Sequence, residues 1–453
     1  MTRLILCNNL VRLRRFLEGE SGPIRFLCLL ESKEGYQIRA LLRGRAGSVE
    51  MPAADLLRER SEAFRLSYVQ FMGDVNVSNH SPDWWAMPFT NKNPLATSLC
   101  RNTAFFLLIA ELLHEDSSPL LVVTDSPDLT AQCKELAKRE RIRILVLVTP
   151  PRFWRTFVKL HTPAGVFKAA VRTLVLMVLS GRFRPAKGQQ GEHLAVVSIT
   201  HDRSFREGGG YQDVYFGSML PKAAKSGTKP LVLGMAAEQP LSQLKRFRRV
   251  EAGFPVIPLE SCLTIVNLAR CLLRSLGLYL RPVLVRGPME IQGVDVGCLV
   301  KRAVREARHS GDLFLNLRVF YCALWFSRNV KFFRCIYPFE NRSWEKMLLL
   351  GMKSGAPGAE LVGYQHASLT MSHTNFMLAP KEVNVTPLPA GILTTGEVIT
   401  RWLTSFSNLP AGLVESACAL RQAQPAPPSP SRDAGFRTRV LIALATKLDE
   451  YVK

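Results

Sequence analysis

The chain has 453 residues, of which 47% are hydrophobic and 21% charged, a composition that is typical of globular proteins and excludes a largely disordered chain. This length exceeds that of one ordinary core and predicts two or three domains. The 59 Lys and Arg residues outnumber the 37 Asp and Glu residues, so a net charge of +22 favours anionic partners such as phosphate groups, acidic membrane or nucleic acid.

Short runs of Val, Ile and Leu alternate with helical patterns along the whole chain. This alternation predicts an α/β fold with Rossmann-like parallel sheets flanked by helices. The clearest helical patterns cover residues 103–115 and 343–355, and the second ends at a glycine that is typical of a helix C-cap. The predicted strands cover residues 3–8, 119–125, 142–149, 193–200, 229–234, 333–339, 359–365 and 390–396. We therefore expect an N-terminal α/β domain at residues 1–160 and a second α/β domain at residues 190–421.

The segment between these domains, residues 161–189, is predicted to be a basic amphipathic connecting helix. Its apolar run at residues 165–184 is interrupted by Lys168 and Arg172, which are spaced as on one face of a helix. A helix that crosses a bilayer needs roughly 20 apolar residues, so this one is not expected to cross it. Two interpretations stay open: the helix packs against the core with a basic rim, or it lies on an anionic membrane surface.

Residues 422–435 are rich in Pro, Ser and Ala and predict a linker without a core. Residues 436–453 have the pattern of one buried strand followed by the opening of a helix. So short a segment cannot bury enough surface to stand alone, so it either completes the preceding sheet or begins a further domain. Because a proline-rich linker normally separates folding units, we expect the start of a truncated C-terminal Rossmann-like domain.

The ten cysteines form no CxxC pair, and most lie in apolar runs such as those around Cys7 and Cys28. This pattern indicates buried reduced thiols and predicts a cytoplasmic location. The apolar stretch near the N-terminus is short, so we expect no signal peptide.

Candidate functional residues follow three consecutive predicted strands. In open parallel sheets, ligands bind beyond the carboxyl ends of the strands. His366 follows the strand at 359–365 and Glu340 the strand at 333–339, while Ser343 is placed to cap a helix that contains Glu345. A titratable imidazole beside a carboxylate is what general base catalysis on a hydroxyl requires, so we predict His366, Glu340 and Glu345 as catalytic residues. A solvated loop histidine is the alternative. The expected substrate-binding residues are Asn341, Tyr364, Gln365, His373, Thr394, Thr395, Gly396, Glu397, Asp202 and Arg203.

No metal site and no cofactor are expected. His366 and His373 lack further ligands at a suitable spacing, and the sequence contains no Asp-x-Asp, GxGxxG or GxxxxGK[ST] motif. The glycine run at residues 208–210, just after Asp202 and Arg203, either approaches a phosphate or forms a turn. Trp84 and Trp85, near Lys92, either stack on a sugar or pack in the core.

Six segments of the chain resemble a bacterial family of surface-carbohydrate biosynthesis proteins, which are transferases for O-antigen, capsule or lipopolysaccharide. The sharpest likeness is in the Pro-Phe-Glu-Asn sequence at 338–341 and the Gly-Tyr-Gln-His sequence at 363–366. The full set of resembling segments is 83–113, 198–222, 337–353, 359–370, 388–403 and 417–421.

The resemblance implies a GT-B-like fold of two Rossmann domains and a metal-independent glycosyltransferase. Such an enzyme would use a nucleotide-sugar donor and a lipid-linked or oligosaccharide acceptor. The donor nucleotide would bind in the C-terminal domain, and the acceptor and the catalytic base would lie in the N-terminal part. Two expectations stay open for this chain: an active transferase, or an incomplete and inactive fragment of one. Members of the family continue past the linker into a further Rossmann-like domain, which the pattern at residues 436–453 resembles. An enzyme of this kind would work in the cytoplasm, as a peripheral protein at the inner face of the plasma membrane.

Two other functions stay open. One is transfer of a polyol phosphate or another activated group, for which the same fold uses a similar histidine. The other is a non-catalytic protein that binds a membrane surface or nucleic acid through its basic residues, with the run at 245–249 as the best local feature. Because the chain has no RNA- or DNA-binding motif, we expect no specific nucleic acid partner.

Overall fold

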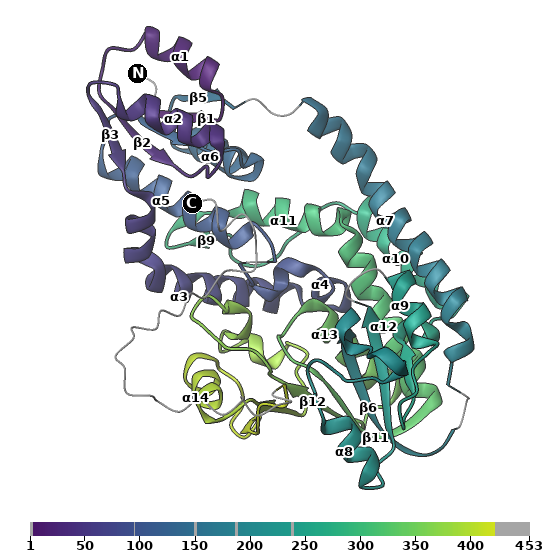
Figure 1. Ribbon diagram of the computed structural model, residues 1–453. Helices are drawn as coiled ribbons and strands as arrows, with labels where there is room; N and C mark the ends of the chain where they lie inside the picture. Colours follow the sequence, from purple (N-terminus) through teal and green to yellow (C-terminus); the bar gives the residue numbers. More distant parts are fainter. Residues whose placement is uncertain (1–2, 95, 149–151, 186–188, 237–239, 422–453) are drawn as a thin grey trace, which may run out of the picture. The chain divides into compact units, whose positions relative to one another are not determined.

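The strands of this protein form two parallel sheets, shown in the computed structural model in Figure 1. The structure describes residues 3–94, 96–148, 152–185, 189–236 and 240–421, and for residues 152–164, 189–191, 207 and 240 it describes the backbone alone. Residues 1–421 cluster as one compact unit. The predicted linker at 422–435 and the predicted domain start at 436–453 lie outside the described residues.

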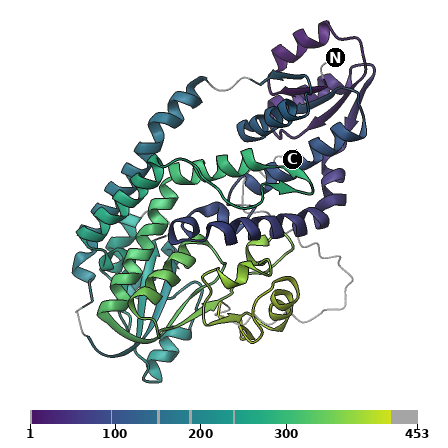
Figure 2. The same ribbon diagram turned by 180° about the vertical axis from the view of Figure 1, so that it is seen from behind.

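The first sheet has five strands in the order β3-β2-β4-β1-β5, and its pairings are parallel. In Figure 2, seen from behind, its purple and blue strands come from the first 147 residues. Its strands are β1 (Leu4–Cys7), β2 (Ile24–Cys28), β3 (Ser48–Met51), β4 (Leu120–Val123) and β5 (Ile144–Leu147).

The second sheet has seven strands in the order β14-β13-β12-β11-β6-β7-β8, all paired in parallel. Its strands are β6 (Gln189–Thr200), β7 (Pro230–Ala236), β8 (Val256–Pro258), β11 (Val330–Pro338), β12 (Glu360–Tyr364), β13 (Gly391–Thr394) and β14 (Val414–Ser416). A separate antiparallel pair joins β9 (Glu290–Ile291) to β10 (Val294–Asp295). The predicted α/β class with Rossmann-like parallel sheets is confirmed.

The helices pack around these sheets. Those of the first 147 residues are α1 (Leu10–Glu18), α2 (Lys33–Arg43), α3 (Ala53–Asn79), α4 (Pro82–Trp85), α5 (Leu99–Glu115) and α6 (Pro127–Arg139). Those that follow are α7 (Arg152–Ser180), α8 (Met219–Lys225), α9 (Pro240–Phe247), α10 (Ile265–Leu280), α11 (Gly297–His309), α12 (Gly311–Asn329), α13 (Ser343–Gly355) and α14 (Glu397–Phe406). Short 3₁₀ turns include η1 (Pro88–Asn91), η6 (Thr374–Phe376) and η7 (Glu382–Asn384).

All eight predicted strands are present, and the strands that the sequence did not reveal are short. β8 and β14 have three residues each and lie at the two edges of the seven-stranded sheet. Three residues are too few to show an apolar period, so only pairing with a neighbouring strand makes them extended. In β2, the apolar run is interrupted by Arg25.

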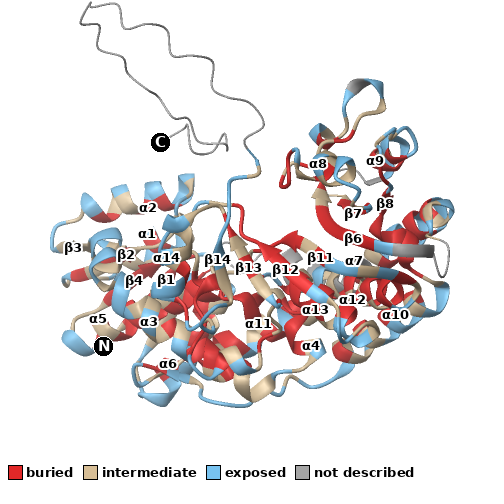
Figure 3. Ribbon diagram, turned by 90° about the horizontal axis from the view of Figure 1, so that it is seen from below, coloured by how far each residue is buried: buried red, intermediate tan, exposed pale blue. Residues whose placement is uncertain are grey.

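One hydrophobic cluster runs from the first sheet to the second. It contains Leu4 of β1, Val122 of β4, Ala195 of β6 and Cys335 of β11. Buried residues, drawn red in Figure 3, make up all of β1 and β4 and nearly all of β7. The helical predictions at 103–115 and 343–355 correspond to α5 and α13. Gly355 is the last residue of α13, not its cap, and a side chain there would collide with Ser327 of α12.

The connecting segment is helical, as predicted, but its bounds differ. The helix α7 begins at Arg152 and ends at Ser180, and β6 begins at Gln189, whereas the sequence predicted a helix over 161–189. Lys168 and Arg172 are exposed on it, spaced as predicted. Among the described residues, no helix combines the length and the apolar character needed to cross a bilayer.

The tryptophan pair belongs to the core. Trp84 and Trp85 are buried, and the Trp84 indole N–H donates to Asn76 Oδ1 at 2.8 Å. The packing alternative for these residues therefore holds, and they form no exposed surface for sugar stacking. All ten cysteines are free thiols, and seven of them are buried.

Candidate active site

The candidate site lies at the carboxyl edge of the seven-stranded sheet. Strands β6, β11, β12 and β13 are neighbours and parallel, so the residues that follow them emerge on one side. His201 follows β6, Glu340 follows β11, His366 follows β12 and Thr395 follows β13. This common edge is where an open parallel sheet binds its ligands.

The structure brings His366 and Glu340 into contact. His366 Nε2 lies 3.5 Å from Glu340 Oε1, and their side chains are 6% and 24% exposed. The other Glu340 oxygen, Oε2, forms an ion pair of 2.5 Å with Arg342 Nη2. Glu340 therefore links an imidazole to a guanidinium, and both ends of its carboxylate are held.

The turn that presents Glu340 is fixed by asparagines. Asn341 has a φ of 54°, a left-handed conformation that asparagine tolerates better than most residues. Its Nδ2 donates to Asn375 O at 2.6 Å, and Asn375 Nδ2 donates to Glu340 O at 2.6 Å. These bonds join the turn after β11 to the loop that follows His366. The same contacts therefore help to fix the positions of Glu340 and His366.

Glu345 acts on Glu340 through the backbone. Its carboxyl oxygens accept from Glu340 N at 2.9 and 3.1 Å, and the side chain is buried at the start of α13. Burial, together with the nearby Glu340 charge, raises the pKa of Glu345 to about 8. At neutral pH Glu345 is thus mostly a neutral acid that positions the turn.

Ser343 does not cap α13, contrary to the prediction. Arg342 occupies the cap position and makes no side-chain capping bond. The Ser343 hydroxyl instead donates to Met87 O and Asn91 Oδ1, both at 3.0 Å. Its partners come from a segment far away in the sequence, which local spacing cannot reveal.

The His366 imidazole is neutral in the folded protein. Burial lowers its pKa to about 4, and the charges of Arg421 and Arg342 act in the same direction. A neutral imidazole that meets a carboxylate through Nε2 carries its proton on Nε2 and a lone pair on Nδ1. In the structure, Nδ1 is buried and has no hydrogen-bond partner. The arrangement therefore directs the basic lone pair to Nδ1.

Next to His366 lies a cluster of three residues that were not predicted as site residues: Tyr215, which contacts His366, and His201 and Arg421, which contact Tyr215. The Tyr215 ring packs against the His366 ring, with centroids 4.6 Å apart, and the Tyr215 hydroxyl is 3.3 Å from His201 Nε2. Arg421 lies over the Tyr215 ring, with its Cζ 4.8 Å from the ring centroid. His201 had the same signal as His366, a histidine directly after a predicted strand, whereas no local pattern points to Tyr215 or Arg421.

The segment 417–421 is attached to this edge by Tyr364. The Tyr364 hydroxyl donates to Cys418 O at 3.0 Å and accepts from Leu420 N at 2.9 Å. Gly217, with a φ of 53°, packs on Leu420, where a Cβ would lie 2.1 Å from the Leu420 carbonyl oxygen. Tyr364 was predicted to bind substrate, but the structure buries its ring and uses its hydroxyl to hold the segment that carries Arg421.

Several buried polar atoms at this edge have no partner. They are Asn341 Oδ1, Gln365 Oε1, His366 Nδ1, Asn375 Oδ1 and Asp202 Oδ1. Buried polar groups normally have hydrogen-bond partners, and a cluster of exceptions is typical of a site that binds a polar ligand. Gln365 follows β12, and its amide nitrogen donates to Ala367 O at 2.5 Å.

The remaining predicted residues take local roles. Thr394 bonds to Thr400 and to Gly396 O, and Gly396 is the N-cap of α14 with a φ of 150°. Glu397 is exposed and lies 3.7 Å from Arg401 on the same helix. Thr395 is half-buried at the same edge.

His373 and the two residues after β6 also have local contacts. His373 Nδ1 accepts from Thr370 N at 3.0 Å within its own loop. Asp202 forms an ion pair of 3.4 Å with Arg246 of α9, and Arg203 is exposed. The structure thus does not bring Arg203, His373 or Glu397 into contact with His366.

The glycine run at 208–210 forms a turn that docks on residues 249–251. Gly209, with a φ of 86°, lies where a Cβ would be 2.5 Å from Arg249 O, and its carbonyl accepts from Glu251 N at 2.8 Å. The need for close backbone approach explains this glycine, so the turn alternative accounts for the motif.

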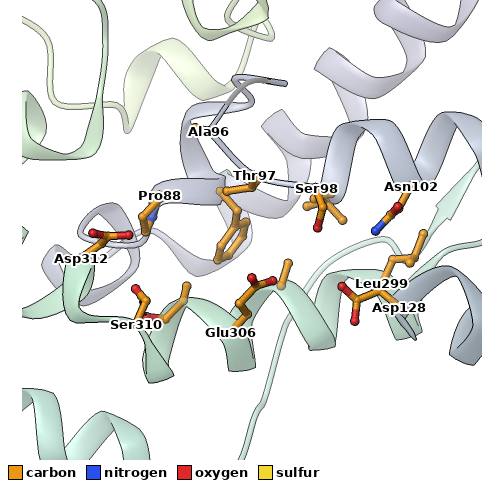
Figure 4. Close-up of a pocket in the computed structure, with 14 residues that line it drawn as sticks. Pro88, Ala96, Thr97, Ser98, Asn102, Asp128, Leu299, Glu306, Ser310 and Asp312 are labelled. Carbon is orange, nitrogen blue, oxygen red and sulfur yellow. Dashed lines mark hydrogen bonds between the residues drawn. The ribbon is translucent and has the colours of Figure 1, made fainter. Parts of the chain in front are cut away.

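A different cavity, of about 90 Å³, lies between the start of α5 and the helix α11 (Figure 4). Three carboxylates line it: Asp128, Glu306 and Asp312. Burial raises the pKa of Glu306, with the Asp128 charge adding to the effect. Ligand pockets usually enclose about 300–1,000 Å³, so this cavity is too small for a sugar nucleotide and its charges suit no phosphate.

In the part of the chain that the structure describes, no three His, Cys, Asp or Glu side chains gather as metal ligands. No family model, curated protein or solved structure matches this chain.

Proposed function

We propose that this chain is a glycosyltransferase of bacterial surface polysaccharide assembly, which transfers a sugar from a nucleotide-activated donor to an acceptor hydroxyl. The observation that carries the reaction type is the contact of His366 Nε2 with Glu340, beside a buried Nδ1 that has no hydrogen-bond partner. The resemblance of the strand-end motifs to surface-carbohydrate transferases supports the substrate class. The acceptor would be lipid-linked or an oligosaccharide, and the proposed location is the cytoplasm, where free thiols persist.

In the proposed reaction, His366 is the general base. Nδ1 takes the proton of the acceptor hydroxyl as its oxygen bonds to the anomeric carbon of the donor, and the bond from that carbon to the nucleotide diphosphate breaks. The Glu340 carboxylate, 3.5 Å from Nε2, stabilises the imidazolium that forms, while Glu345 and Asn375 hold the turn.

The charges of Arg342 and Arg421 would make the pKa of His366 depend on whether a donor is bound. A pKa of about 4 makes His366 a weak base in the free protein, partly because of the Arg421 and Arg342 charges. An anionic diphosphate beside these guanidinium groups would neutralise them and raise the pKa of His366 toward neutrality. Donor binding would thus strengthen the base, and the cations would then stabilise the departing diphosphate.

Transfer of a polyol phosphate or another activated group is the second candidate. It also needs a base at a hydroxyl and cations near an anionic leaving group, so His366, Arg342 and Arg421 would serve it equally. Donor chemistry separates the two candidates. A non-catalytic role in binding nucleic acid rests on the net charge alone.

The test is nucleotide release by the purified chain from a panel of UDP-, GDP- and CMP-sugars and CDP-polyols. We expect release from a sugar donor, with His366→Ala lowering turnover by about 10²–10⁴-fold without loss of folding. His373→Ala is the matched control, because this histidine bonds only within its own loop, and it should stay near the wild-type rate.

Three results would count against the proposal. Near-normal turnover by His366→Ala would remove the base assignment, and loss of activity on adding a chelator would contradict a metal-independent reaction. Release from CDP-polyols alone would select the second candidate. If the wild-type chain consumes no donor of the panel, both candidates lose their support.

A further inference from the structure

The helix α10 exposes an apolar stripe to solvent. Leu273 and Leu280 are 69% and 78% exposed, although leucine is usually buried. The exposed residues recur at the spacing of one helix face and continue past the end of the helix. They are Ile265, Val266, Leu273, Leu276, Leu280 and Leu284.

The neighbouring helix α7 has a similar face. α7 contacts α10 and α9, and it runs beside α10 in Figure 1. A shallow groove on α7 is lined by Phe167, Val171 and Val175, together with Leu241 of α9. Among the described side chains of α7, those of residues 165–180, the exposed apolar ones are Phe167, Val171, Leu174, Val175, Val178 and Leu179. We call these residues, those of α10 and Leu241 the α7–α10 surface.

The charge of these three helices has one sign. The sequences of α7, α9 and α10 contain no Asp or Glu, while Lys168, Arg172, Lys245 and Arg270 are exposed on them. Lys168 and Arg172 also line the apolar groove on α7. A surface that joins apolar side chains to basic ones matches a bilayer with anionic headgroups, which offers acyl chains and negative charge together.

A second copy of the chain fits this surface less well. Self-association through the same face would bring its basic residues against those of the other copy, and like charges repel. We propose that the α7–α10 surface attaches the protein to an anionic membrane, with the apolar residues inserted among the lipids and the basic residues at the headgroups. This proposal is independent of the transferase activity.

The test is flotation of the full chain with vesicles. Vesicles of phosphatidylcholine with phosphatidylglycerol should carry the protein upward, and pure phosphatidylcholine should carry far less. Leu273→Glu/Leu280→Glu should lower binding to the anionic vesicles by about tenfold or more, because two apolar anchors are replaced by charges that anionic lipid repels. Lys168→Gln/Arg172→Gln should also lower it, by about 25-fold, since each basic residue near the surface contributes about a fivefold factor.

The matched control is Leu66→Glu/Val398→Glu. These residues are 61% and 72% exposed on α3 and α14, away from the α7–α10 surface, and the change in net charge equals that of the α10 variant. The control should bind within about twofold of the wild type. Circular dichroism checks folding, and Leu273→Ser/Leu280→Ser replaces the glutamate pair if that pair does not fold.

The proposal is overturned if the wild type does not float with anionic vesicles, or floats equally with neutral ones. It is also overturned if the α10 variant binds as well as its control. Light scattering measures the oligomeric state. If the wild type is a dimer and the α10 variant is a monomer, the surface binds a second copy of the chain and the membrane proposal is wrong.

Discussion

At the carboxyl edge of the five-stranded sheet, the polar residues that follow the strands cap helices. Asn9 Oδ1 accepts from Arg12 N at 3.0 Å, and Ser126 Oγ accepts from Leu129 N at 3.2 Å. Ser32 does the same at the start of α2. These side chains satisfy amides that the first turn of a helix would otherwise leave unpaired.

At the carboxyl edge of the seven-stranded sheet, the helices α13 and α14 begin without a side-chain cap. The polar residues meet one another instead, as His366 and Glu340 do, and several keep an unpartnered buried atom. The carboxyl edges of two parallel sheets thus differ in what their polar groups do. One uses them to stabilise local structure, and the other leaves them available, which is the pattern expected of a binding site.

The largest effect should come from the buried ion pair that supports the seven-stranded edge. Glu382 pairs with Lys92 and accepts from Asn76 Nδ2 at 2.7 Å, and Thr374 Oγ1 donates to Lys92 O at 2.6 Å. Lys92→Met leaves the Glu382 charge buried without its ion-pair partner. We expect the free energy of unfolding to fall by about 3–5 kcal/mol in guanidinium denaturation.

The control for this prediction is Lys92→Met/Glu382→Leu, which removes both charges and should recover much of the loss. A cost below about 1 kcal/mol for Lys92→Met would mean that the pair contributes no more than a surface ion pair. In that case the seven-stranded edge would not depend on this support.

The next effect concerns the orientation of the imidazole. Glu340→Gln replaces the carboxylate that lies 3.5 Å from His366 Nε2 with a neutral amide, which removes the negative charge that favours a proton on Nε2. Turnover of a donor identified in the nucleotide-release panel should fall by about 10²-fold or more. Glu397→Gln, at the same edge but paired only with Arg401, is the control and should keep the wild-type rate. Equal effects of the two changes would remove the special role of Glu340.

The third prediction is a pH dependence caused by Glu345. Its pKa of about 8 in the folded protein lies above the unfolded value of 4.5, so the folded state binds the extra proton between these two values. The contribution of Glu345 to stability is therefore present below pH 4.5 and lost as pH rises to about 8, by about 1.4 kcal/mol per pH unit at most.

Glu345→Gln keeps an acceptor for Glu340 N but does not titrate. The variant should thus gain stability relative to the wild type as pH rises from 5 to 8, measured by urea denaturation at each pH. Comparing the two proteins cancels other groups, including His366, whose lowered pKa changes stability in the opposite direction. A constant difference between them across this range would show that Glu345 is ionised throughout.

The smallest effect belongs to the five-stranded edge. Ser126→Ala removes the cap of α6 and should cost about 1 kcal/mol of stability in urea denaturation, with turnover unchanged. If turnover falls by more than the fraction of folded protein, Ser126 takes part in the reaction. The five-stranded edge would then not have a purely structural role.

The sequence alone determined the α/β class, eight of the strands and the placement of His366 and Glu340 at strand ends. These follow from local causes: apolar periods define strands, and parallel strands deliver their following residues to one edge. The sequence also predicted a helix with Lys168 and Arg172 exposed between the two sheets.

Only the tertiary structure decided which of the edge residues meet. Tyr215 packs against His366 from a segment about 150 residues away, and Arg421 lies over the Tyr215 ring. Ser343 bonds across the chain instead of capping its helix. Burial raises the pKa of Glu345 and lowers that of His366, while the α10 leucines stay exposed. Each outcome depends on which surfaces of the helices and strands pack against other elements. The spacing of residues along the chain does not predict which surfaces pack together, because elements far apart in the sequence make those contacts.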